Sequence, residues 1–544
     1  MISGFGKGSH LRGNWLTPKS QPPISTTFYR RGTHENPATE TMNIFIEEPF
    51  DPVADMPLYQ QLYGRLQRAI LAGWLPGGYK LPSTRALADE LMVSRNTVLT
   101  AYEQLTAEGY IESVEGSGTF VADVLPAQLL TTADKPVGPV PKPRQPPADR
   151  SQLSQRAQAM LTSPQISPLL PASANGRPRP FSLGMSALDA FPYPIWSRLV
   201  ARQARQLSIG ALTYQDAAGY RPLREAIAAH VTVSRSVRCS PDQIVIVAGA
   251  QGGFDLVARL LLNPGDPVWM EDPGYVGARG ALLGAGAEIV PVPIDHEGLM
   301  VEIGIERAPD ARLIYVTPSH QFPLGVTMSL ARRLALLEWA KATNAYILED
   351  DYDSEFRFAG RPLATLQGLD RADRVIYVGT FSKVLAPALR IGYLILPPLL
   401  VEPFLKVRRL VDFHLPVLEQ AVLADFMAEG YYTRHLRRMR TLFAERRSAL
   451  LAALAELPLD LHAPEVGSHC VGWLPAGMDG LRLLHQAAAH DLNLWLLSSY
   501  SIEPMAREGL VIGYGDHGTE EMQAAVRKLG EVMQLVCQYG SERA

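Results

Sequence analysis

A lysine stands shortly after an apolar run in the segment GTFSKVLAPALR, residues 379–390. Lys383 follows Thr380 by three residues and precedes Arg390 by seven, with Ser382 beside it. A lysine after a strand is usually exposed and inert, but a positioned lysine amine can form a Schiff base with an aldehyde. A hydroxyl and a guanidinium near that amine suit a phosphate group. The segment therefore indicates either a surface lysine or the anchor of a covalent, phosphorylated cofactor.

Three adjacent carboxylates follow another apolar run, in EDDYDSEF, residues 349–356. Carboxylates at a strand exit repel one another unless a cation lies among them. We expect Asp350 to hold a protonated ring nitrogen and Tyr352 to place a hydroxyl near the same ring. The alternative is a solvated acidic loop.

A glycine-rich turn, VAGAQGGFDL at residues 247–256, leads from an apolar run into a helical pattern. The backbone amides of Ala250 and Gln251 can bind phosphate at the positive end of that helix. Tyr275, in EDPGY, can stack on a ring, although ordinary core packing is the alternative. An amine, an acid, a hydroxyl and phosphate donors are the four requirements of a pyridoxal 5'-phosphate (PLP) site.

The elements that must position these residues alternate in type after about residue 181. Continuous apolar runs separated by helical stretches are typical of an α/β fold with a mostly parallel sheet. Ligands of such sheets gather at the carboxyl ends of the strands. The predicted strands lie at residues 244–247, 268–270, 313–316, 346–348 and 375–378.

A smaller unit precedes this body, at residues 57–122. Apolar spacing predicts three helices and a hairpin, with Ser83 and Ser94 as caps of the second and third helices. The turn Met92-Val93 between these helices predicts a helix-turn-helix, with a wing around residues 116–118. A protein-docking module is the alternative.

The start of the third helix is expected to contact DNA bases and phosphates, through Ser94, Arg95, Asn96 and Thr97. Arg85, on the preceding helix, is expected to contact a backbone phosphate. Five Lys/Arg against six Asp/Glu give this unit a net charge of −1. One such unit should bind DNA weakly, and two should bind better.

Length and composition indicate the class of protein. A chain of 544 residues is too long for a single hydrophobic core, so at least two domains are expected. Its composition, with 47% hydrophobic and 19% charged residues and a net charge of −4, is that of a globular protein. Three distant cysteines favour a reducing compartment, the cytoplasm, and no metal site. No apolar run is long enough to span a membrane. Twelve of 43 prolines fall within residues 123–180, a predicted linker, and residues 1–56 are a predicted disordered or mis-assigned leader.

Residues 80–120 resemble the winged helix-turn-helix of the GntR family of bacterial regulators. The motifs LPSTRALA, VSRNTV, AYEQL, EGYI and GSGTF occur in order. This resemblance implies double-stranded operator DNA as a partner, contacted by Arg85, Ser94, Arg95 and Thr97, with Gly118 at the wing tip.

The body, residues 181–544, is similar to fold type I, aspartate aminotransferase-like proteins. The order of phosphate turn, EDPGY, TPSHQFPLG, EDDYDSEF, GTFSK and ALR-x-GY is specific. The combination with a GntR unit resembles the MocR subfamily of regulators. It implies a Schiff base at Lys383, Asp350 on the ring nitrogen and Tyr352 near the phenolic oxygen. It also implies a homodimer and a phosphate site of Arg390, Thr380, Ser382, Ala250, Gln251 and the partner's Tyr214.

Two segments depart from the aminotransferase pattern. Phe322-Pro-Leu-Gly325 stands where such enzymes carry Asn-Pro-x-Gly, so the asparagine near the ring oxygen is absent, and His320 and Gln321 are the candidates to substitute for it. Arg507 lies one position early for the arginine that holds a substrate carboxylate. The arginine is shifted, or the effector is not held as an ordinary α-amino acid.

These observations favour a PLP-dependent transcription regulator that senses an amine or amino-acid effector through an aldimine at Lys383. A working aminotransferase with an accessory DNA-binding unit is the alternative. A third reading treats the body as a cofactor-free dimerisation scaffold.

Overall fold

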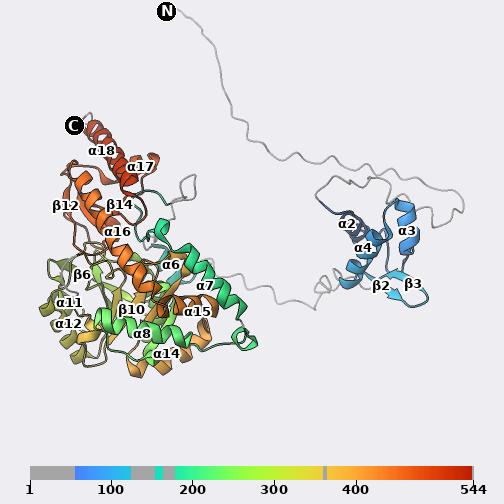
Figure 1. The fold of residues 1–544 in the computed structure, drawn as a ribbon, viewed down its shortest axis with the longest axis horizontal. Helices are drawn as coiled ribbons and strands as arrows, with labels where there is room; N and C mark the ends of the chain where they lie inside the picture. The colour runs from blue at the N-terminus through green and yellow to red at the C-terminus, as the bar shows by residue number, and fades with distance from the viewer. Residues whose placement is uncertain (1–55, 124–152, 163–177, 207, 359–363, 542–544) are drawn as a thin grey trace, which may run out of the picture. The chain divides into compact units, whose positions relative to one another are not determined.

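The computed structural model describes residues 56–123, 153–162, 178–206, 208–358 and 364–541. The chain divides into two compact units, Met1–Arg150 and Ser151–Ala544. Figure 1 draws the described part of the small unit in blue and the large unit in green to red. The predicted leader lies outside the described residues except for Met56. None of the helices in these described ranges is both long and apolar enough to cross a membrane.

The small unit is a winged helix-turn-helix, as predicted. Met92 takes a left-handed conformation (φ 53°) at the end of the second helix, which turns the chain toward the third. Ser83 accepts a hydrogen bond from the amide of Ala86 at 3.2 Å, and Ser94 from that of Thr97 at 3.1 Å, so both predicted caps form. The strands pair antiparallel in the order β1-β3-β2. The elements are α2 (Leu58–Leu71), β1 (Lys80–Leu81), α3 (Thr84–Leu91), α4 (Arg95–Ala107), β2 (Ile111–Val114) and β3 (Gly118–Val121).

The large unit is built on an eight-stranded sheet of order β4-β11-β10-β9-β8-β5-β6-β7. The five central strands from β10 to β6 run parallel, whereas β11, β4 and β7 pair antiparallel with their neighbours. The predicted mostly parallel sheet is therefore confirmed. The strands are β4 (Ile244–Ala248), β5 (Pro267–Asp272), β6 (Glu288–Asp295), β7 (Gly298–Leu299), β8 (Leu313–Val316), β9 (Tyr346–Asp351), β10 (Val375–Thr380) and β11 (Ile391–Ile395).

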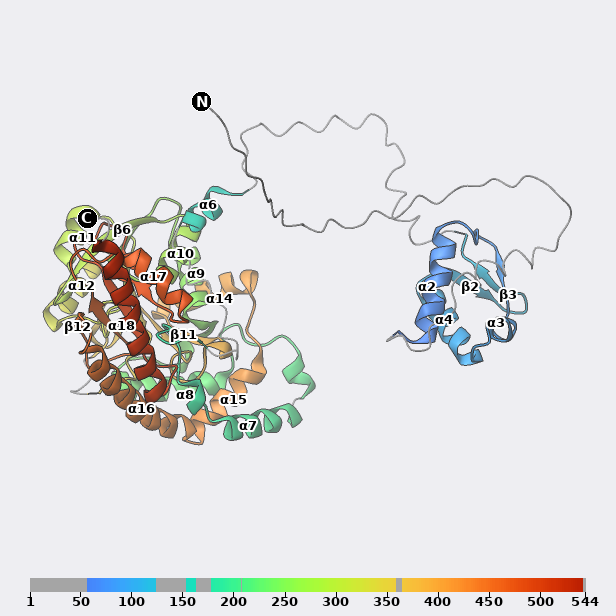
Figure 2. The ribbon, with the colours of Figure 1, turned by 90° about the horizontal axis from the view of Figure 1, so that it is seen from above.

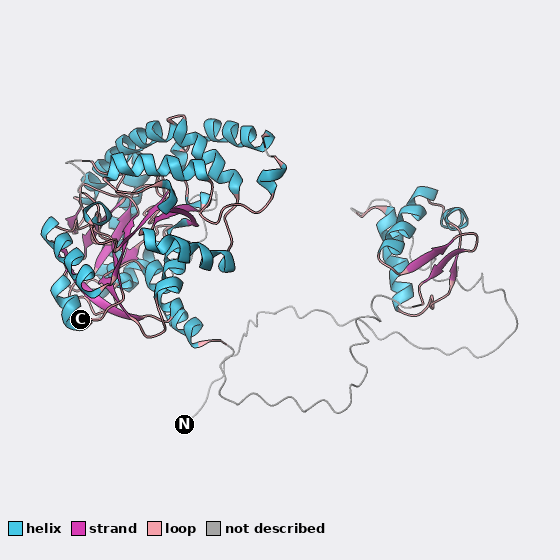
Figure 3. Ribbon diagram, turned by 90° about the horizontal axis from the view of Figure 1, so that it is seen from below, coloured by secondary structure: helices cyan, strands magenta, loops and turns pink. Residues whose placement is uncertain are grey.

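Helices cover both faces of this sheet, as Figure 3 shows. Alternate residues of one strand point to opposite faces. In β4, Ile244 and Ile246 belong to one buried cluster, and Val245 and Val247 to another. The first cluster includes residues of α8 (Arg221–Arg235), α15 (Val417–Ala428) and α16 (Tyr431–Leu454), and the second includes residues of α9 (Gly249–Leu261), α10 (Val276–Ala285) and α14 (Pro398–Val411).

The remaining helices are α6 (Gln155–Thr162), α7 (Tyr193–Arg205), α11 (Val301–Arg307), α12 (Leu330–Thr343), α13 (Leu366–Leu369), α17 (Gly480–Ala489) and α18 (Thr519–Ser541). The long helices α16 and α18 pack against each other (Figure 2). A second, antiparallel sheet of order β12-β13-β15-β14 lies in the C-terminal part. Its strands are β12 (Asp460–His462), β13 (His469–Trp473), β14 (Trp495–Leu496) and β15 (Gly509–Gly513).

Part of the proline-rich segment belongs to the large unit. Residues 155–162, within the predicted linker, form α6, which packs against α10. A Cβ added at Gly284 of α10 would lie 3.0 Å from the sulfur of Met160, so the glycine permits this close approach. The chain thus contacts the body well before residue 181.

Candidate cofactor site and nucleic-acid interface

The ends of two neighbouring parallel strands bring Asp350 and Lys383 to one edge of the sheet. Asp350 of β9 pairs in register with Val378 of β10, and Lys383 follows β10 by three residues. Each of the two groups shifts the pKa of the other, as expected for opposite charges near each other. The predicted amine and acid therefore share one site.

The amine of Lys383 lies against the backbone of Gly184. Its Nζ donates a hydrogen bond to the Gly184 carbonyl oxygen at 3.1 Å. Gly184 has φ +73°, and a Cβ there would lie only 2.4 Å from Nζ, so no other residue fits without movement. Burial lowers the pKa of Lys383, although the charges of Asp353 and Asp350 oppose that effect. A lowered pKa favours the neutral amine, which is the nucleophilic form.

One oxygen of the buried Asp350 carboxylate is unpaired. Its Oδ2 accepts a hydrogen bond from the Tyr315 hydroxyl at 2.7 Å, whereas Oδ1 has no partner among the residues that the structure describes. Burial raises the pKa of Asp350 to about 7, against the effect of the Tyr315 hydrogen bond. A protonated ring nitrogen at Oδ1 would supply both the missing donor and a compensating charge. The site therefore fits a pyridinium-type cofactor.

His320 lies beside Tyr352, near the position predicted for the missing asparagine. The hydroxyl oxygen of Tyr352 lies 2.9 Å from Nδ1 of His320. The amide nitrogen of Gln321 instead donates to Glu271 at 3.2 Å and to the Pro273 carbonyl at 2.8 Å. Of the two substitutes that the sequence offered, His320 is the one that reaches Tyr352.

The predicted phosphate residues meet at the start of α9. This helix begins at Gly249 (φ +66°), and a Cβ there would lie 3.2 Å from the guanidinium of Arg390. Arg390 donates to the Ala248 carbonyl at 2.9 Å. The first-turn amides of Ala250 and Gln251 have no acceptor within the helix, because no preceding turn exists. Their amides and Arg390 are therefore suited to bind an anion at this end of the site.

Two hydroxyl-bearing residues follow β10. The Thr380 hydroxyl accepts a hydrogen bond from the Ser382 amide at 3.2 Å, which folds the chain back toward the strand end. Thr380 is buried, and the Ser382 side chain is partly exposed. The phosphate contacts of Thr380 and Ser382 remain predictions.

Tyr275 immediately precedes α10, and its ring packs among other aromatic residues. Burial raises its pKa to about 12, with the charge of Asp350 adding to the shift and that of Arg390 opposing it. Its ring meets Phe322 edge-on, with centroids 5.7 Å apart. Its stacking on a cofactor ring remains a prediction.

Tyr214 and Arg507 lie at the surface. The Tyr214 side chain is 82% exposed and its ring packs against Phe413, with centroids 4.9 Å apart. The contact of Tyr214 with the phosphate bound by the other subunit of a dimer remains a prediction. Arg507 forms an ion pair with Asp460 at 2.6 Å and lies 5.5 Å above the Trp473 ring. Arg507 is thus already engaged with this chain's own residues.

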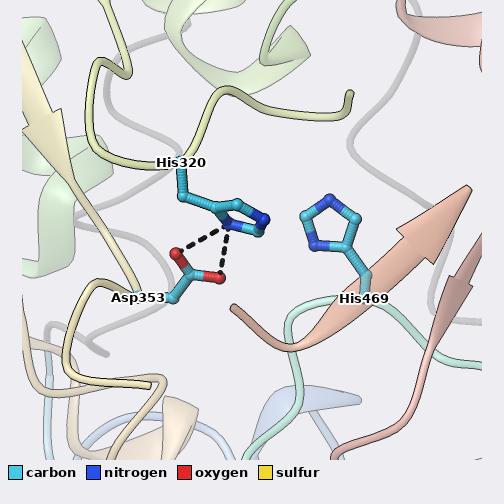
Figure 4. Close-up of side chains that lie close together, drawn as sticks. All are labelled: His320, Asp353 and His469. Carbon is cyan, nitrogen blue, oxygen red and sulfur yellow. Dashed lines mark hydrogen bonds and ion pairs between the residues drawn. The ribbon is translucent and has the colours of Figure 1, made fainter. Parts of the chain in front are cut away.

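Sequence reasoning missed several residues of the site. Gly184 and Tyr315 supply the carbonyl and the hydroxyl described above, and neither belongs to a motif. Asp353 and His469 were also missed, and they form a buried cluster with His320 (Figure 4). The signal for Asp353 was present, because it belongs to the same acidic run as Asp350.

The predicted DNA-reading residues occupy the exposed start of α4. Arg95 and Asn96 are exposed in its first turn, and Arg85 is exposed on α3. The hydroxyls of Ser94 and Thr97 lie 2.8 Å apart, so both help to cap the helix. Gly118 opens β3 with φ +119°. Lys80, which sequence reasoning did not select, lies beside the wing, because a Cβ at Gly118 would be 3.0 Å from its Cε.

Both units match known families. Residues 191–481 match the class I and II aminotransferase family, and residues 58–121 match the GntR family of bacterial regulatory proteins. The chain is 40% identical over 483 residues to a probable rhizopine catabolism regulatory protein, MocR, of Rhizobium meliloti, covering 88% of this chain and 94% of that protein. It is 33% identical over 478 residues to the pyridoxine biosynthesis transcriptional regulator PdxR of Corynebacterium glutamicum, covering 87% of this chain and 96% of that protein.

Solved aminotransferase structures resemble the large unit. LysN, an α-aminoadipate aminotransferase from Thermus thermophilus in complex with N-(5'-phosphopyridoxyl)-L-leucine, has a TM-score of 0.64 at 28% identity. The match covers 71% of this chain and 98% of the LysN chain. The aminotransferase class I and II family depends on PLP, which agrees with the amine, acid and anion-binding end found here. The chain therefore belongs to the MocR-type GntR-family transcriptional regulators, which join a winged helix-turn-helix to a fold type I aminotransferase-like domain.

Proposed function

We propose that this regulator binds PLP through a Schiff base at Lys383 and senses an amine or amino-acid-like effector that displaces that lysine. The observation that carries the proposal is the unpaired, buried Oδ1 of Asp350 at the same sheet edge as the Lys383 amine. A buried carboxylate oxygen without a donor is costly, and a bound pyridinium removes that cost.

Each predicted residue has a defined task toward the cofactor. When bound, PLP supplies an aldehyde that combines reversibly with amines. Asp350 keeps a proton on the ring nitrogen, and Tyr352 with His320 holds the phenolic oxygen. Tyr275 lies against the ring. The phosphate is held by Ala250, Gln251, Thr380, Ser382 and Arg390.

Effector binding to the large unit is proposed to change how the winged helix-turn-helix units bind DNA. We infer that the protein acts in the cytoplasm as a homodimer, in which Tyr214 of each subunit reaches the phosphate of the other. Two winged helix-turn-helix units then bind half-sites about 34 Å apart, or a multiple of that distance. An effector switches DNA binding only if it binds two states of the body with different affinity.

A working aminotransferase is the second candidate. It is favoured by the completeness of the site and by 31% identity over 360 residues to an aromatic-amino-acid aminotransferase of Thermococcus litoralis. Steady release of a keto acid with a 2-oxo acid acceptor would favour this candidate. A single spectral change without product would favour the regulator.

The decisive experiment is an absorbance spectrum of purified protein incubated with PLP. We expect a band near about 420 nm that Lys383→Ala abolishes and Lys406→Ala keeps. Lys406 is a matched control, because it is exposed on α14 and pairs with Glu402. A wild-type protein without this band would refute cofactor binding and leave the scaffold interpretation.

A further inference from the structure

Two buried histidines lie beside a buried carboxylate in the large unit (Figure 4). One ligand-type atom from each of His320, Asp353 and His469 lies within 4.8 Å of the others. The three residues are 1%, 0% and 3% exposed, and the two imidazole rings have centroids 4.9 Å apart. The contact of His320 with Tyr352 uses only Nδ1, so the proposed cofactor contacts leave Nε2 of His320 and the ring of His469 unused.

Each imidazole is oriented through one of its two nitrogens. Nδ1 of His320 lies 3.0 and 3.1 Å from the two oxygens of Asp353, which accept hydrogen bonds, so this nitrogen carries a proton. Nε2 of His469 donates to the carbonyl oxygen of Pro323 at 3.0 Å. A carboxylate and a backbone carbonyl are the partners that usually orient metal-binding histidines from behind.

The lone pairs of the two neutral rings lie on the opposite nitrogens, Nε2 of His320 and Nδ1 of His469. Nε2 of His320 is buried and has no partner among the residues that the structure describes. In Figure 4 this nitrogen is directed toward the ring of His469. Two nitrogen ligands are therefore presented to one position between the rings.

The carboxylate of Asp353 favours a cation at that position over a water molecule. Within the described ranges, its ion-pair partner is His320, and no lysine or arginine pairs with it. When His320 is neutral, a negative charge remains buried without a paired cation, which is costly. A water molecule would donate to both lone pairs but would bring no charge, whereas a divalent cation supplies both a partner and a charge.

The type of ligand limits the type of cation. Imidazole nitrogens suit Zn²⁺, Cu²⁺ and Ni²⁺, whereas Mg²⁺ and Ca²⁺ prefer oxygen ligands. With Zn–N bonds of about 2.0–2.1 Å and tetrahedral angles, two ligating nitrogens lie about 3.3 Å apart, which a cluster of this size can provide. The expectation of no metal site rested on the spacing of the cysteines, which does not bear on histidine ligands.

We propose that Nε2 of His320 and Nδ1 of His469 bind a divalent transition metal ion of the zinc class, with Asp353 as the outer carboxylate that orients His320 and balances the charge. Water completes the coordination. The ion would connect separate parts of the fold, because His320 follows β8 and Asp353 follows β9 of the large sheet, whereas His469 begins β13 of the C-terminal sheet. The proposal is independent of the proposed function, because it requires neither PLP nor an amine.

Zinc binding to the full-length protein tests this site. The protein as purified is freed of metal with a chelator, dialysed against ZnCl₂ and analysed by inductively coupled plasma mass spectrometry. We expect one Zn²⁺ per chain, retained in an excess of Mg²⁺. X-ray absorption at the zinc edge should then show two imidazole ligands. Both measurements use the wild-type protein, so they do not depend on the folding of a variant.

Three variants locate the ion, with zinc affinity measured by calorimetry. Asp353→Asn removes the outer carboxylate and should weaken zinc binding about 10- to 100-fold. His469→Gln removes a ligand and should weaken it at least as much. His230→Gln should leave the affinity unchanged, because His230 is a half-buried histidine of α8 that packs edge-on against Tyr432 and belongs to no such cluster among the described residues.

Three results would overturn the metal site: wild-type protein that retains no zinc, a zinc spectrum without two imidazoles, or an affinity that His469→Gln leaves unchanged. The first would assign the two lone pairs to a bridging water molecule, and the other two would show adventitious zinc elsewhere. Zinc binding in a protein that lacks the absorbance band near about 420 nm would refute the proposed function and leave the metal site intact.

Discussion

The carboxylates of Asp350 and Asp351 are neighbours in the chain with different partners. Asp351 forms a buried ion pair with Arg235 at 2.6 Å and accepts a hydrogen bond from the Tyr377 hydroxyl at 2.6 Å. Asp350 has one hydroxyl partner, and its other oxygen has no partner within the described ranges of the chain. We therefore expect substitution by asparagine to affect stability in opposite directions at the two positions.

The size of the Asp350 effect follows from its pKa. Burial raises this pKa from 3.8 to about 7. For a carboxyl whose folded-state pKa is raised, the cofactor-free protein loses stability as pH rises from the unfolded pKa to the folded one. At about 1.4 kcal/mol per pKa unit, the loss is about 2 kcal/mol at pH 5 and about 4 kcal/mol at pH 8. Asp350→Asn removes this loss, so it should stabilise the cofactor-free protein more at pH 8.

Asp351→Asn should do the reverse. It leaves the guanidinium of Arg235 buried without a charge partner, which costs about 3–5 kcal/mol. Urea unfolding of the cofactor-free protein, followed by tryptophan fluorescence at the two pH values, measures both variants against wild type.

PLP affinity is a second property that distinguishes Asp350→Asn from Asp351→Asn. Asp350→Asn should weaken PLP binding about 10- to 100-fold, because a charge-assisted hydrogen bond becomes neutral. If Asp350→Asn instead destabilised the protein as much as Asp351→Asn at pH 8 and bound PLP with wild-type affinity, the assignment of Asp350 to the ring nitrogen would be wrong.

Three further outcomes are expected. Gly184→Ala should weaken PLP binding and reduce the absorbance band near about 420 nm, because the new Cβ would be strained at φ +73° and would lie 2.4 Å from the Lys383 Nζ. Arg95→Ala should weaken operator binding by about 1–3 kcal/mol if it reads a base, or reduce the salt slope by about 1 if it binds phosphate, as fluorescence anisotropy measures. Gly467→Ala should lower the melting temperature, because its Cβ would lie 2.0 Å from Cε1 of His320.

Local signals predicted much of the fold. Each expected apolar run lies within one of the strands β4, β5, β8, β9 and β10, since β-branched residues that are buried on both faces leave a continuous pattern. Strand β6 was not predicted, because Pro291 and Pro293 interrupt it. It contains two prolines although β5 and β7 pair on either side of it.

The site was predicted where motifs carry it and missed where it depends on distant parts of the chain. Lys383, Asp350 and Arg390 each follow or flank a recognisable strand. Gly184 lies 199 residues before the lysine whose amine it binds, and His469 comes from the C-terminal sheet. No local pattern records such contacts, because only the folded backbone brings these residues together.

The docking of α6 on α10 changes where the DNA-reading unit is anchored. Only 31 residues separate Asp123, at the end of the winged unit, from Gln155, at the start of α6. Even a fully stretched chain of that length spans at most about 110 Å, roughly half of what the interval from Asp123 to Phe181 would allow. As long as Met160 stays packed over Gly284, each winged unit can therefore lie no more than about 110 Å from the start of α6 of its own chain.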